Sequence, residues 1–482
     1  MSVTYLPELE RWAEKEHLAS DLINTCSKLW LTTSTELMLF RKPLYNVTSN
    51  QVLSHHQYAE SVSGLPITIE DTVLLAQAIA RLTLAPSRID LGRLATEWHH
   101  ERSSTASADH FVKEKLASHI RREQKTLTPK NVVLFGFGRI GRLITRLLIS
   151  QTGRGEQLRL RAIVLRKCKP EDLTKRADLL RHDSVHGPFE GIITEDTENL
   201  TLTINGQKIQ FIESETPDDI DYTRYGIENA LIIDNSGVFR DEPGLSRHLA
   251  SKGVDRVLLT APAKGNIPNI VTGINDSLSK DKTIRIFSAA SCTTNAIVPV
   301  LKVIEDRFGI EKGHIETIHA YTNDQNLLDN YHKKYRRGRS AALNLVITET
   351  GAGSAVARIL PHLAGRLTGN AVRVPTPNVS LAILHLALQQ PSTKEEINGT
   401  LRDAALYGPL IEQLDYAISN ELVSSDLVGN SHSSIIDSQA TLMSADGMSA
   451  VLYIWYDNEC GYSHQVIRLA KRISDVVRIT YY

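Results

Sequence analysis

Cys292 is the residue whose type and surroundings most directly suggest covalent chemistry. It lies in SAASCTTNAIVP, residues 288–299, between an apolar run that predicts a strand (284–287) and one at helical spacing (296–304). The positive end of a helix dipole lowers the pKa of a thiol at the first turn, and the hydroxyls of Ser291 and Thr293 can donate to an anion. Cys292 is therefore a candidate nucleophile, and the alternative is a small apolar side chain at a turn.

A thiol nucleophile needs a base close by. The strand-like segment HIETIHAYT, residues 314–322, offers His314 and His319. Imidazole titrates near neutral pH and suits this task. The residues alone do not decide which histidine lies beside Cys292.

A glycine-rich turn suggests a second kind of chemistry. VVLFGFGRIGRLITRLL places Gly136, Gly138 and Gly141 in a GxGxxG pattern after an apolar strand and at the opening of a helix. The first glycine permits the turn, the second lets the backbone approach a pyrophosphate, and the third lets helix pack on strand. We expect a dinucleotide site, and the alternative is a turn without a ligand.

The end of the next strand departs from the dinucleotide pattern. A carboxylate usually follows this strand and accepts from the ribose hydroxyls. Here LRLRAIVL ends at Leu165, and Arg166 and Lys167 follow. The two cations can meet a 2′-phosphate or can be solvated surface charges, so the choice between NAD and NADP stays open.

Composition excludes several classes of protein. The 54 Lys and Arg nearly balance the 55 Asp and Glu, which leaves no electrostatic footprint for nucleic acid or a membrane surface. The four cysteines are far apart, so we expect no metal site and no disulfide framework. The N-terminus does not resemble a signal peptide, and no apolar run approaches membrane-spanning length. We expect a cytoplasmic enzyme.

The pattern of the chain changes twice. Residues 1–128 are mostly at helical spacing and predict a helical N-terminal module that ends near TLTPK, residues 126–130. Residues 129–290 alternate short apolar strands with amphipathic helices, which predicts an α/β domain with a Rossmann-type doubly wound parallel sheet. Residues 291–458 contain longer strand-like stretches that predict an α+β catalytic domain with a mixed sheet.

From about residue 131 to 476 the chain resembles the phosphorylating glyceraldehyde-3-phosphate dehydrogenase family. The motifs that carry the resemblance occur in order: FGFGRIGR (135–142), DSVHGPF (183–189), SGVF (236–239), SAASCTTNA (288–296), HAYTNDQ (319–325), TGNAVRVPTPNVS (368–380), SSDLVGNSHSS (424–434) and WYDNECGYS (455–463). The resemblance implies a dinucleotide-binding domain, a catalytic domain and a C-terminal helix, residues 459–482, that returns to the first domain.

The resemblance implies a reaction. Cys292 would attack the aldehyde of D-glyceraldehyde 3-phosphate to form a thiohemiacetal, and His319 would be its base. Hydride loss to the nicotinamide would leave a thioester, and inorganic phosphate would displace it to give 1,3-bisphosphoglycerate. This is a step of carbohydrate metabolism, in glycolysis or in gluconeogenesis. His314 is left as structural.

The resemblance also implies two anion pockets. Thr322 and Arg373 match the residues for the substrate phosphate, and Arg337 matches an arginine that serves near both pockets in some relatives. Guanidinium groups suit this task because they stay charged and grip oxyanions in a forked geometry. The residues that match the pocket for the incoming phosphate are Ser291, Thr293, Thr350 and Gly351. Singly, each of these residues also has a structural explanation, such as a turn cap or a surface ion pair.

The cofactor is expected to be NAD or NADP. By resemblance, Asn458 would hydrogen-bond the nicotinamide carboxamide and Tyr462 would line the ring pocket. The complete predicted set is Gly136, Gly138, Arg139, Ile140, Gly141, Arg166, Thr260, Asn458 and Tyr462.

Three departures from the family concern the cofactor. Phe135 replaces an asparagine before the glycines, Leu165 replaces the ribose-binding acid, and Asn330 with Tyr331 stand where NAD-selective relatives often have leucine and proline. None of the three concerns the aldehyde chemistry.

Residues 1–128 lie outside the family core. They can pack on the core, add an oligomer contact or recruit a protein partner, and the core itself is expected to form the homotetramer typical of the family. Two other functions remain. One is oxidation of erythrose 4-phosphate with water in place of phosphate, and the other is a regulatory or binding protein that acts through the extension. Retention of Cys292, His319 and Arg373 argues against the latter.

Overall fold

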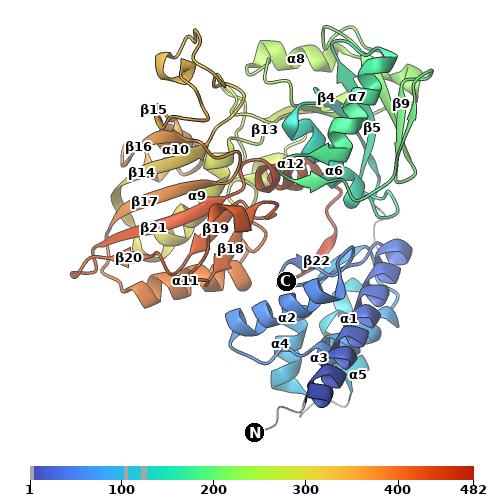
Figure 1. The fold of residues 1–482 in the computed structure, drawn as a ribbon, viewed down its shortest axis with the longest axis vertical. Helices are drawn as coiled ribbons and strands as arrows, with labels where there is room; N and C mark the ends of the chain where they lie inside the picture. The colour runs from blue at the N-terminus through green and yellow to red at the C-terminus, as the bar shows by residue number, and fades with distance from the viewer. Residues whose placement is uncertain (1–4, 103–106, 121–126) are drawn as a thin grey trace. The chain divides into compact units, whose positions relative to one another are not determined.

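The computed structural model describes residues 5–102, 107–120 and 127–482, and the chain divides into two units (Figure 1). The first unit contains the described residues before Pro129 together with Gly153–Glu156 and Val477–Tyr482. The second contains Pro129–Thr152 and Gln157–Val476. Within the described ranges, no helix is both long and apolar enough to cross a bilayer.

The first unit contains the predicted helices. They are α1 (Tyr5–Thr33), α2 (Ser49–Ser63), α3 (Ile69–Ala80), α4 (Leu91–Glu101) and α5 (Ala108–Lys115). Polar side chains begin four of them, since Thr48, Thr68, Asp90 and Ser107 each accept a hydrogen bond from a backbone N–H of the first turn. The prediction of a helical N-terminal region is confirmed.

The first unit also contains a sheet that the sequence pattern did not predict. Its strands, in spatial order, are β2 (Lys42–Pro43), β1 (Glu36–Leu39), β3 (Ser87–Asp90) and β22 (Ile479–Tyr481). The last strand comes from the C-terminus of the chain and pairs in parallel with β3. Arg478 is buried with its guanidinium over the ring of Trp30, and the Tyr481 hydroxyl donates to Glu97.

The expectation that residues 459–482 form one returning helix is therefore wrong at its end. The helix, α12, spans Cys460–Ile473, and Asp475 follows it with φ of 54°, a left-handed conformation that stops a helix. The β-branched and aromatic residues Ile479, Thr480 and Tyr481 then form a strand, as such residues prefer.

The second unit begins with an eight-stranded sheet. Its spatial order is β13 (Ile286–Ser288), β12 (Val254–Leu259), β11 (Ala230–Asp234), β4 (Lys130–Phe135), β5 (Leu158–Leu165), β10 (Gln207–Glu213), β9 (Thr201–Ile204) and β8 (Ile193–Asp196). The strands from β13 to β10 are parallel, and β9 pairs antiparallel with both β10 and β8. The predicted doubly wound parallel sheet is confirmed.

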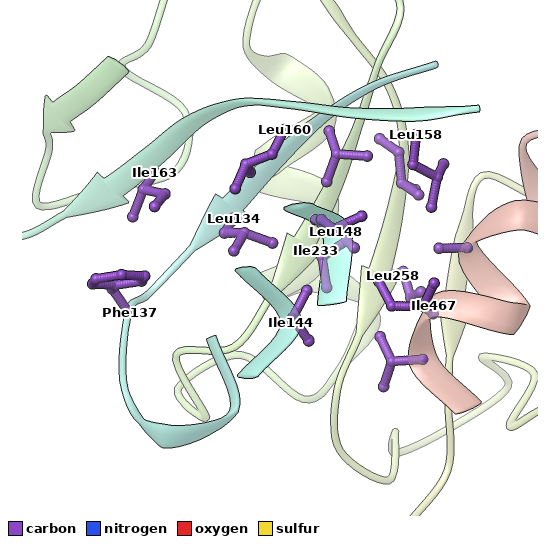
Figure 2. Close-up of a cluster of buried hydrophobic side chains, with 14 of the residues drawn as sticks. Leu134, Phe137, Ile144, Leu148, Leu158, Leu160, Ile163, Ile233, Leu258 and Ile467 are labelled. Carbon is purple, nitrogen blue, oxygen red and sulfur yellow. The ribbon is translucent and has the colours of Figure 1, made fainter. Parts of the chain in front are cut away.

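Helices cover both faces of this sheet. The helices α6 (Arg139–Ser150), α7 (Pro170–Arg181) and α12 share one core cluster with it, and α8 (Glu242–Ala250) packs in another. Figure 2 shows Ile144 and Leu148 of α6 and Ile467 of α12 against sheet residues such as Leu134. Because both faces are buried, the strands read as continuous apolar runs.

A second sheet carries the rest of the unit. Its spatial order is β15 (Val346–Thr348), β16 (Leu367–Val374), β14 (Ile310–Ala320), β17 (Ser380–Leu388), β21 (Ser449–Tyr456), β19 (Ser434–Asp437) and β18 (Leu414–Ala417), with β20 (Leu442–Met443) beside β21. The pair β14–β16 is parallel and β14–β17 is antiparallel, so the predicted mixed sheet is confirmed. The helices α9 (Cys292–Phe308), α10 (Ala352–Ile359) and α11 (Lys394–Leu406) share its core.

Candidate active site

The thiol of Cys292 lies at the N-terminus of α9. Strand β13 ends at Ser288, and Ser291 caps the helix by accepting from the N–H of Thr294 at 3.0 Å. Cys292 is the first helical residue and contacts the cores of both sheets. The local sequence therefore places this sulfur between the two sheets, at the positive end of a 17-residue helix.

His319 faces this sulfur from the end of β14. Its Nε2 lies 3.6 Å from Sγ of Cys292, and its Nδ1 lies 2.7 Å from the carbonyl oxygen of Ala320. A proton on Nδ1 would be donated to that oxygen and would leave the lone pair of Nε2 facing the thiol, whereas Nη1 of Arg373, 3.0 Å from the same Nδ1, can donate only to a lone pair there. His314 is turned elsewhere, within hydrogen-bond distance of Thr368 and Asn370.

Burial acts on both members of this pair. It raises the pKa of the Cys292 thiol, and the charge of Arg373 opposes the rise. Burial, followed by the charge of Arg373, lowers the pKa of His319 to about 4. The lowered thiol pKa that the helix position predicts is thus outweighed by burial. Burial opposes each charged form taken alone. Transfer of the proton from Sγ to Nε2 instead creates a thiolate and an imidazolium side by side, so that the two opposite charges stabilise each other, with the helix N-terminus beside the sulfur.

Arg373 is the cation nearest to this pair. It lies on β16 directly opposite His319 in the parallel register. Its Nη1 donates to the carbonyl of Ala320 at 2.9 Å and to Oγ1 of Thr322 at 3.2 Å. Its Nε is buried and has no hydrogen-bond partner among the described residues. A buried donor of this kind is suited to an anion.

A second arginine lies on the far side of Thr322. Arg337 pairs with Asp324, and its Nε and Nη2 donate to Oγ1 of Thr348 at 3.2 and 3.1 Å. Thr322 donates to the same carboxylate of Asp324. An anion that approaches Thr322 and Arg337 therefore competes with Asp324 for the same donors.

The remaining residues predicted for phosphate lie in two places. Ser291 and Thr293 flank the thiol, and Oγ1 of Thr293 is 3.0 Å from the hydroxyl of Tyr456. Thr350 accepts from the N–H of Ala352, and Gly351 precedes α10. Across the described residues, no hydrogen bond ties Thr350 or Gly351 to Cys292 or His319.

The glycine turn fits a dinucleotide pyrophosphate. Gly136 directly follows β4 and has a φ of 100°. A Cβ at this position would lie 3.1 Å from the backbone nitrogen of Ser236, in the loop after β11. A Cβ on Gly141 would lie 2.7 Å from the carbonyl of Gly136, whereas one on Gly138 would meet no atom within 4 Å. The turn therefore has no room for a side chain at Gly136 and Gly141, where the helix packs on the strand. At Gly138 it leaves space for a ligand over the first turn of α6, which includes Ile140.

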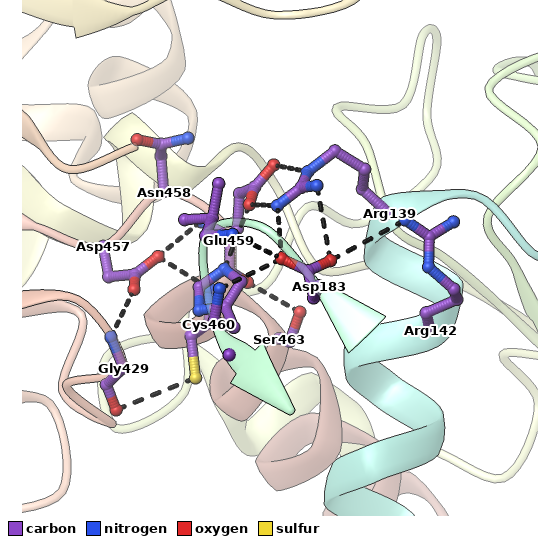
Figure 3. Close-up of polar contacts among 12 residues, drawn as sticks. Arg139, Arg142, Asp183, Gly429, Asp457, Asn458, Glu459, Cys460 and Ser463 are labelled. Carbon is purple, nitrogen blue, oxygen red and sulfur yellow. Dashed lines mark hydrogen bonds and ion pairs between the residues drawn. The ribbon is translucent and has the colours of Figure 1, made fainter. Parts of the chain in front are cut away.

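The side chain of Arg139 is engaged elsewhere. It forms ion pairs with Glu459, at the start of α12, and with Asp183, and Figure 3 shows these pairs joining α6 to the other two segments. His186 also lies 3.0 Å from Glu459. Asp183 and His186 come from the hairpin of β6 (His182–Asp183) and β7 (Gly187–Pro188). This leaves the backbone of Arg139, rather than its guanidinium, to face the turn.

Asn458 and Tyr462 lie far from Cys292 and His319 in the sequence, but hydrogen bonds link them to the segments that carry those two residues. Asn458 is buried after β21, and its Oδ1 accepts from the Ser380 hydroxyl at 2.9 Å, which leaves the amide Nδ2 to donate. The Tyr462 hydroxyl donates to the carbonyl of Ala290 at 2.9 Å, two residues before Cys292. Thr260 follows β12 and donates to the carbonyl of Asp234.

Ser380 is a residue of this site to which the sequence pattern assigned no role. Its Oγ accepts from the N–H of Ala320 at 3.1 Å while it donates to Asn458. The carbonyl of the same residue, Ala320, accepts from His319. Ser380 lies within the TPNVS stretch, but only the register of β14, β17 and β21 brings it between these partners.

Comparison with known proteins identifies the core of the chain. Residues 130–242 match the family described as "Glyceraldehyde 3-phosphate dehydrogenase, NAD binding domain", and residues 291–458 match "Glyceraldehyde 3-phosphate dehydrogenase, C-terminal domain". The Bacillus subtilis (strain 168) glyceraldehyde-3-phosphate dehydrogenase 1 is 40% identical over 342 residues, which are 70% of this chain and 96% of that protein. Glyceraldehyde-3-phosphate dehydrogenase 2 of Trichormus variabilis is 39% identical over 345 residues, 71% of this chain and 98% of that protein.

A further relative resembles nearly the whole chain. A "Glyceraldehyde-3-phosphate dehydrogenase-like protein" of Pseudomonas aeruginosa (strain UCBPP-PA14) is 49% identical over 460 residues, 94% of this chain and 98% of the relative. A match of this extent includes most of the residues before Pro129. The family resemblance and the expectation of NAD or NADP as cofactor are confirmed. The chain belongs to the glyceraldehyde-3-phosphate dehydrogenase family of oxidoreductases.

Proposed function

We propose that this protein is a phosphorylating glyceraldehyde-3-phosphate dehydrogenase that converts D-glyceraldehyde 3-phosphate and inorganic phosphate into 1,3-bisphosphoglycerate. The observation that carries the proposal is the 3.6 Å approach of Sγ of Cys292 to Nε2 of His319, with Arg373 and Thr322 hydrogen-bonded alongside. This set combines a nucleophile, a base and a phosphate-binding cation.

The first step is attack of the Cys292 sulfur on the aldehyde carbon. The thiol proton passes to Nε2 of His319 and from there to the aldehyde oxygen, which gives a thiohemiacetal. His319 then removes the proton of that hydroxyl while the C–H bond breaks with its electron pair. The nicotinamide of NAD or NADP, when bound, would accept this hydride. The same imidazole thus serves as base twice, and a neutral His319, supported by its lowered pKa, is the form that both steps need.

The second half replaces sulfur by phosphate. An oxygen of inorganic phosphate attacks the thioester carbon, the C–S bond breaks, and Cys292 leaves as a thiolate at the N-terminus of α9. The helix dipole stabilises this leaving group. The product is an acyl phosphate that retains the energy of the oxidation.

Two groups of residues would hold the anions. Arg373 and Thr322 bind the phosphate of the substrate, and the unpartnered Nε of Arg373 supports this role. Arg337 joins them once Asp324 is displaced. The group for the incoming phosphate is Ser291, Thr293, Thr350 and Gly351.

The cofactor would lie across the ends of the parallel strands. The open backbone at Gly138 and the first turn of α6 hold the pyrophosphate. The Nδ2 group of Asn458 donates to the nicotinamide carboxamide, and the bond from Ser380 fixes that amide in the required orientation. Tyr462 and Thr260 line the ring side of the site.

We expect a homotetramer in the cytoplasm. Residues 327–347 expose large apolar side chains that a monomer would leave in water: Leu327, Leu328, Tyr331, Tyr335, Leu343 and Leu345. Such a set supports a contact between subunits. Light scattering tests the tetramer, and a monomer at micromolar concentration would contradict it. The first unit remains a candidate for an added subunit contact or for a protein partner.

An assay of products tests the function. Purified protein is mixed with D-glyceraldehyde 3-phosphate, cofactor and phosphate, and 1,3-bisphosphoglycerate is trapped with phosphoglycerate kinase and ADP. Formation of ATP supports the proposal. Reduced cofactor without ATP, or faster turnover with erythrose 4-phosphate and no phosphate, supports the non-phosphorylating alternative. No reduction of either NAD or NADP supports the regulatory one.

A further inference from the structure

The carboxyl end of β5 lacks an acceptor for the ribose. In a doubly wound sheet, the strand beside the glycine turn ends where the adenosine ribose binds. Here β5 lies directly beside β4, and its last residue, Leu165, is 6% exposed and packs in the core under α6 and α7. An apolar side chain in this position cannot accept from the 2′- and 3′-hydroxyls.

Two cations follow Leu165 directly. Arg166 and Lys167 are both exposed, and neither forms an ion pair or a side-chain hydrogen bond within the part of the chain that the structure describes. Both belong to the short connection between β5 and α7. Their charges are therefore available to a ligand at the strand end.

A third cation stands behind them on α7. Arg176 is half-buried, and its Nε has no hydrogen-bond partner among the described residues. Its charge acts both on Cys168, in the loop after β5, and on Arg142, in the first turn of α6. The guanidinium thus lies within electrostatic reach of both that loop and the helix that begins at the glycine turn.

One carboxylate also lies at this edge of the sheet. Glu213 ends β10 opposite Leu165, and it accepts from the backbone N–H of Cys168 at 2.8 Å. This bond fixes the loop that carries Arg166 and Lys167. It also engages one carboxylate oxygen of Glu213, which could otherwise accept from a ribose hydroxyl.

We propose that the loop after β5 is a binding site for the 2′-phosphate of NADP, with Arg166 and Lys167 as its direct ligands. The guanidinium of Arg166 can grip two phosphate oxygens, and Lys167 adds a point charge. Arg176 is a positioning residue that raises the positive potential of the loop. This inference rests on the proposed function, whose cofactor is NAD or NADP, and it selects NADP. The absence of an acid at Leu165 then has an explanation.

Equilibrium binding tests the site without turnover. Dissociation constants of NADP⁺ and NAD⁺ are measured by calorimetry on the full chain, together with 2′,5′-ADP and 5′-AMP as probes of the adenosine half. The wild type should bind NADP⁺ and 2′,5′-ADP at least about tenfold more tightly than NAD⁺ and 5′-AMP. This preference should shrink as ionic strength rises, because the loop is exposed.

Substitutions distinguish direct binding of the 2′-phosphate by Arg166 and Lys167 from a general effect of positive surface charge. Combined Arg166→Ala and Lys167→Ala should weaken NADP⁺ and 2′,5′-ADP by at least about tenfold and leave NAD⁺ unchanged. Arg166→Asp should reverse the preference toward NAD⁺, since a carboxylate there accepts from ribose hydroxyls. Lys208→Ala is the matched control, an exposed cation at the opposite end of β10.

Three results would overturn the proposal. They are NAD⁺ binding as tight as NADP⁺ in the wild type, equal losses for both cofactors in the double variant, and no measurable binding of either cofactor. The first two leave the proposed reaction intact, because phosphate-dependent turnover with NAD⁺ can still be observed. NAD⁺ preference that disappears in Glu213→Gln would instead assign the ribose to Glu213.

Discussion

Sγ of Cys292 lies 3.6 Å from Nε2 of His319, although the two residues are 27 positions apart in the chain. One comes from the first turn of α9 and the other from the end of β14. In the tautomer with the proton on Nδ1, the carbonyl of Ala320 accepts from that nitrogen and the lone pair of Nε2 faces the thiol. The reactivity of Cys292 should therefore depend on His319.

Replacement of His319 by asparagine tests this dependence. The variant keeps a donor for the carbonyl of Ala320 and loses the base. Because burial raises the pKa of the Cys292 thiol, the neutral form then persists to higher pH. Alkylation by iodoacetamide at pH 7 should slow by about 10- to 100-fold, and its pH profile should move to the alkaline side. His314→Asn is the control and should behave as wild type. An unchanged profile in His319→Asn would remove His319 from the mechanism.

The forked geometry of Arg373 should govern binding of the substrate phosphate. Arg373→Lys keeps the charge and loses the planar, forked arrangement of donors, so KM for glyceraldehyde 3-phosphate should rise by about 10- to 100-fold with a smaller change in kcat. Arg402→Lys is a matched control in the same domain, on the exposed face of α11. A loss confined to kcat would indicate that Arg373 acts on the reacting centre instead.

The hydroxyl of Ser380 should orient Asn458 for the nicotinamide. Ser380→Ala removes a hydrogen bond to a buried amide, which costs about 1–2 kcal/mol, so the cofactor should bind roughly 5- to 30-fold more weakly. Ser380→Thr keeps the hydroxyl and should restore the affinity. Cofactor titration by fluorescence measures both. Equal affinity in Ser380→Ala and wild type would mean that Asn458 is held by other contacts.

The C-terminal strand should stabilise the first unit. Deletion of Val477–Tyr482 removes β22 and the buried Arg478. The transition of this unit in calorimetry should fall by roughly 10 °C. Tyr481→Phe, which removes only the bond to Glu97, should lower it much less. A chain without residues 1–128 and 477–482 should keep phosphate-dependent turnover. Loss of all turnover from a folded core would show that the first unit contributes to the site.

Local patterns predicted the parts of this protein that depend on neighbouring residues. The strand Lys130–Phe135 is buried on both faces and therefore reads as an apolar run, and the glycines after it have the spacing that the turn at Gly136 requires. The position of Cys292 at a helix start follows in the same way from the cap at Ser291.

Contacts between distant segments were beyond such patterns. The pairing of Thr480 with Arg88 joins the C-terminal strand to a strand nearly 400 residues earlier and leaves no local period in either segment. The bond of Ser380 to Asn458 depends on the register of two strands. Resemblance supplied the partnership of Cys292 and His319, which spacing did not. Arg139 was predicted at the cofactor from the glycine motif, and the ion pair of its guanidinium with Glu459, far along the chain, could not be read from that motif.

We expect a thioester to form on Cys292 and to persist until inorganic phosphate displaces it. The most direct measurement is rapid-mixing absorbance of reduced cofactor, with glyceraldehyde 3-phosphate added in the absence of phosphate. Cofactor reduction should show a burst of about one reduced cofactor per Cys292 and then stop, should resume when phosphate is added, and should be absent in Cys292→Ser. Steady reduction without phosphate, or a burst that survives in Cys292→Ser, would contradict it.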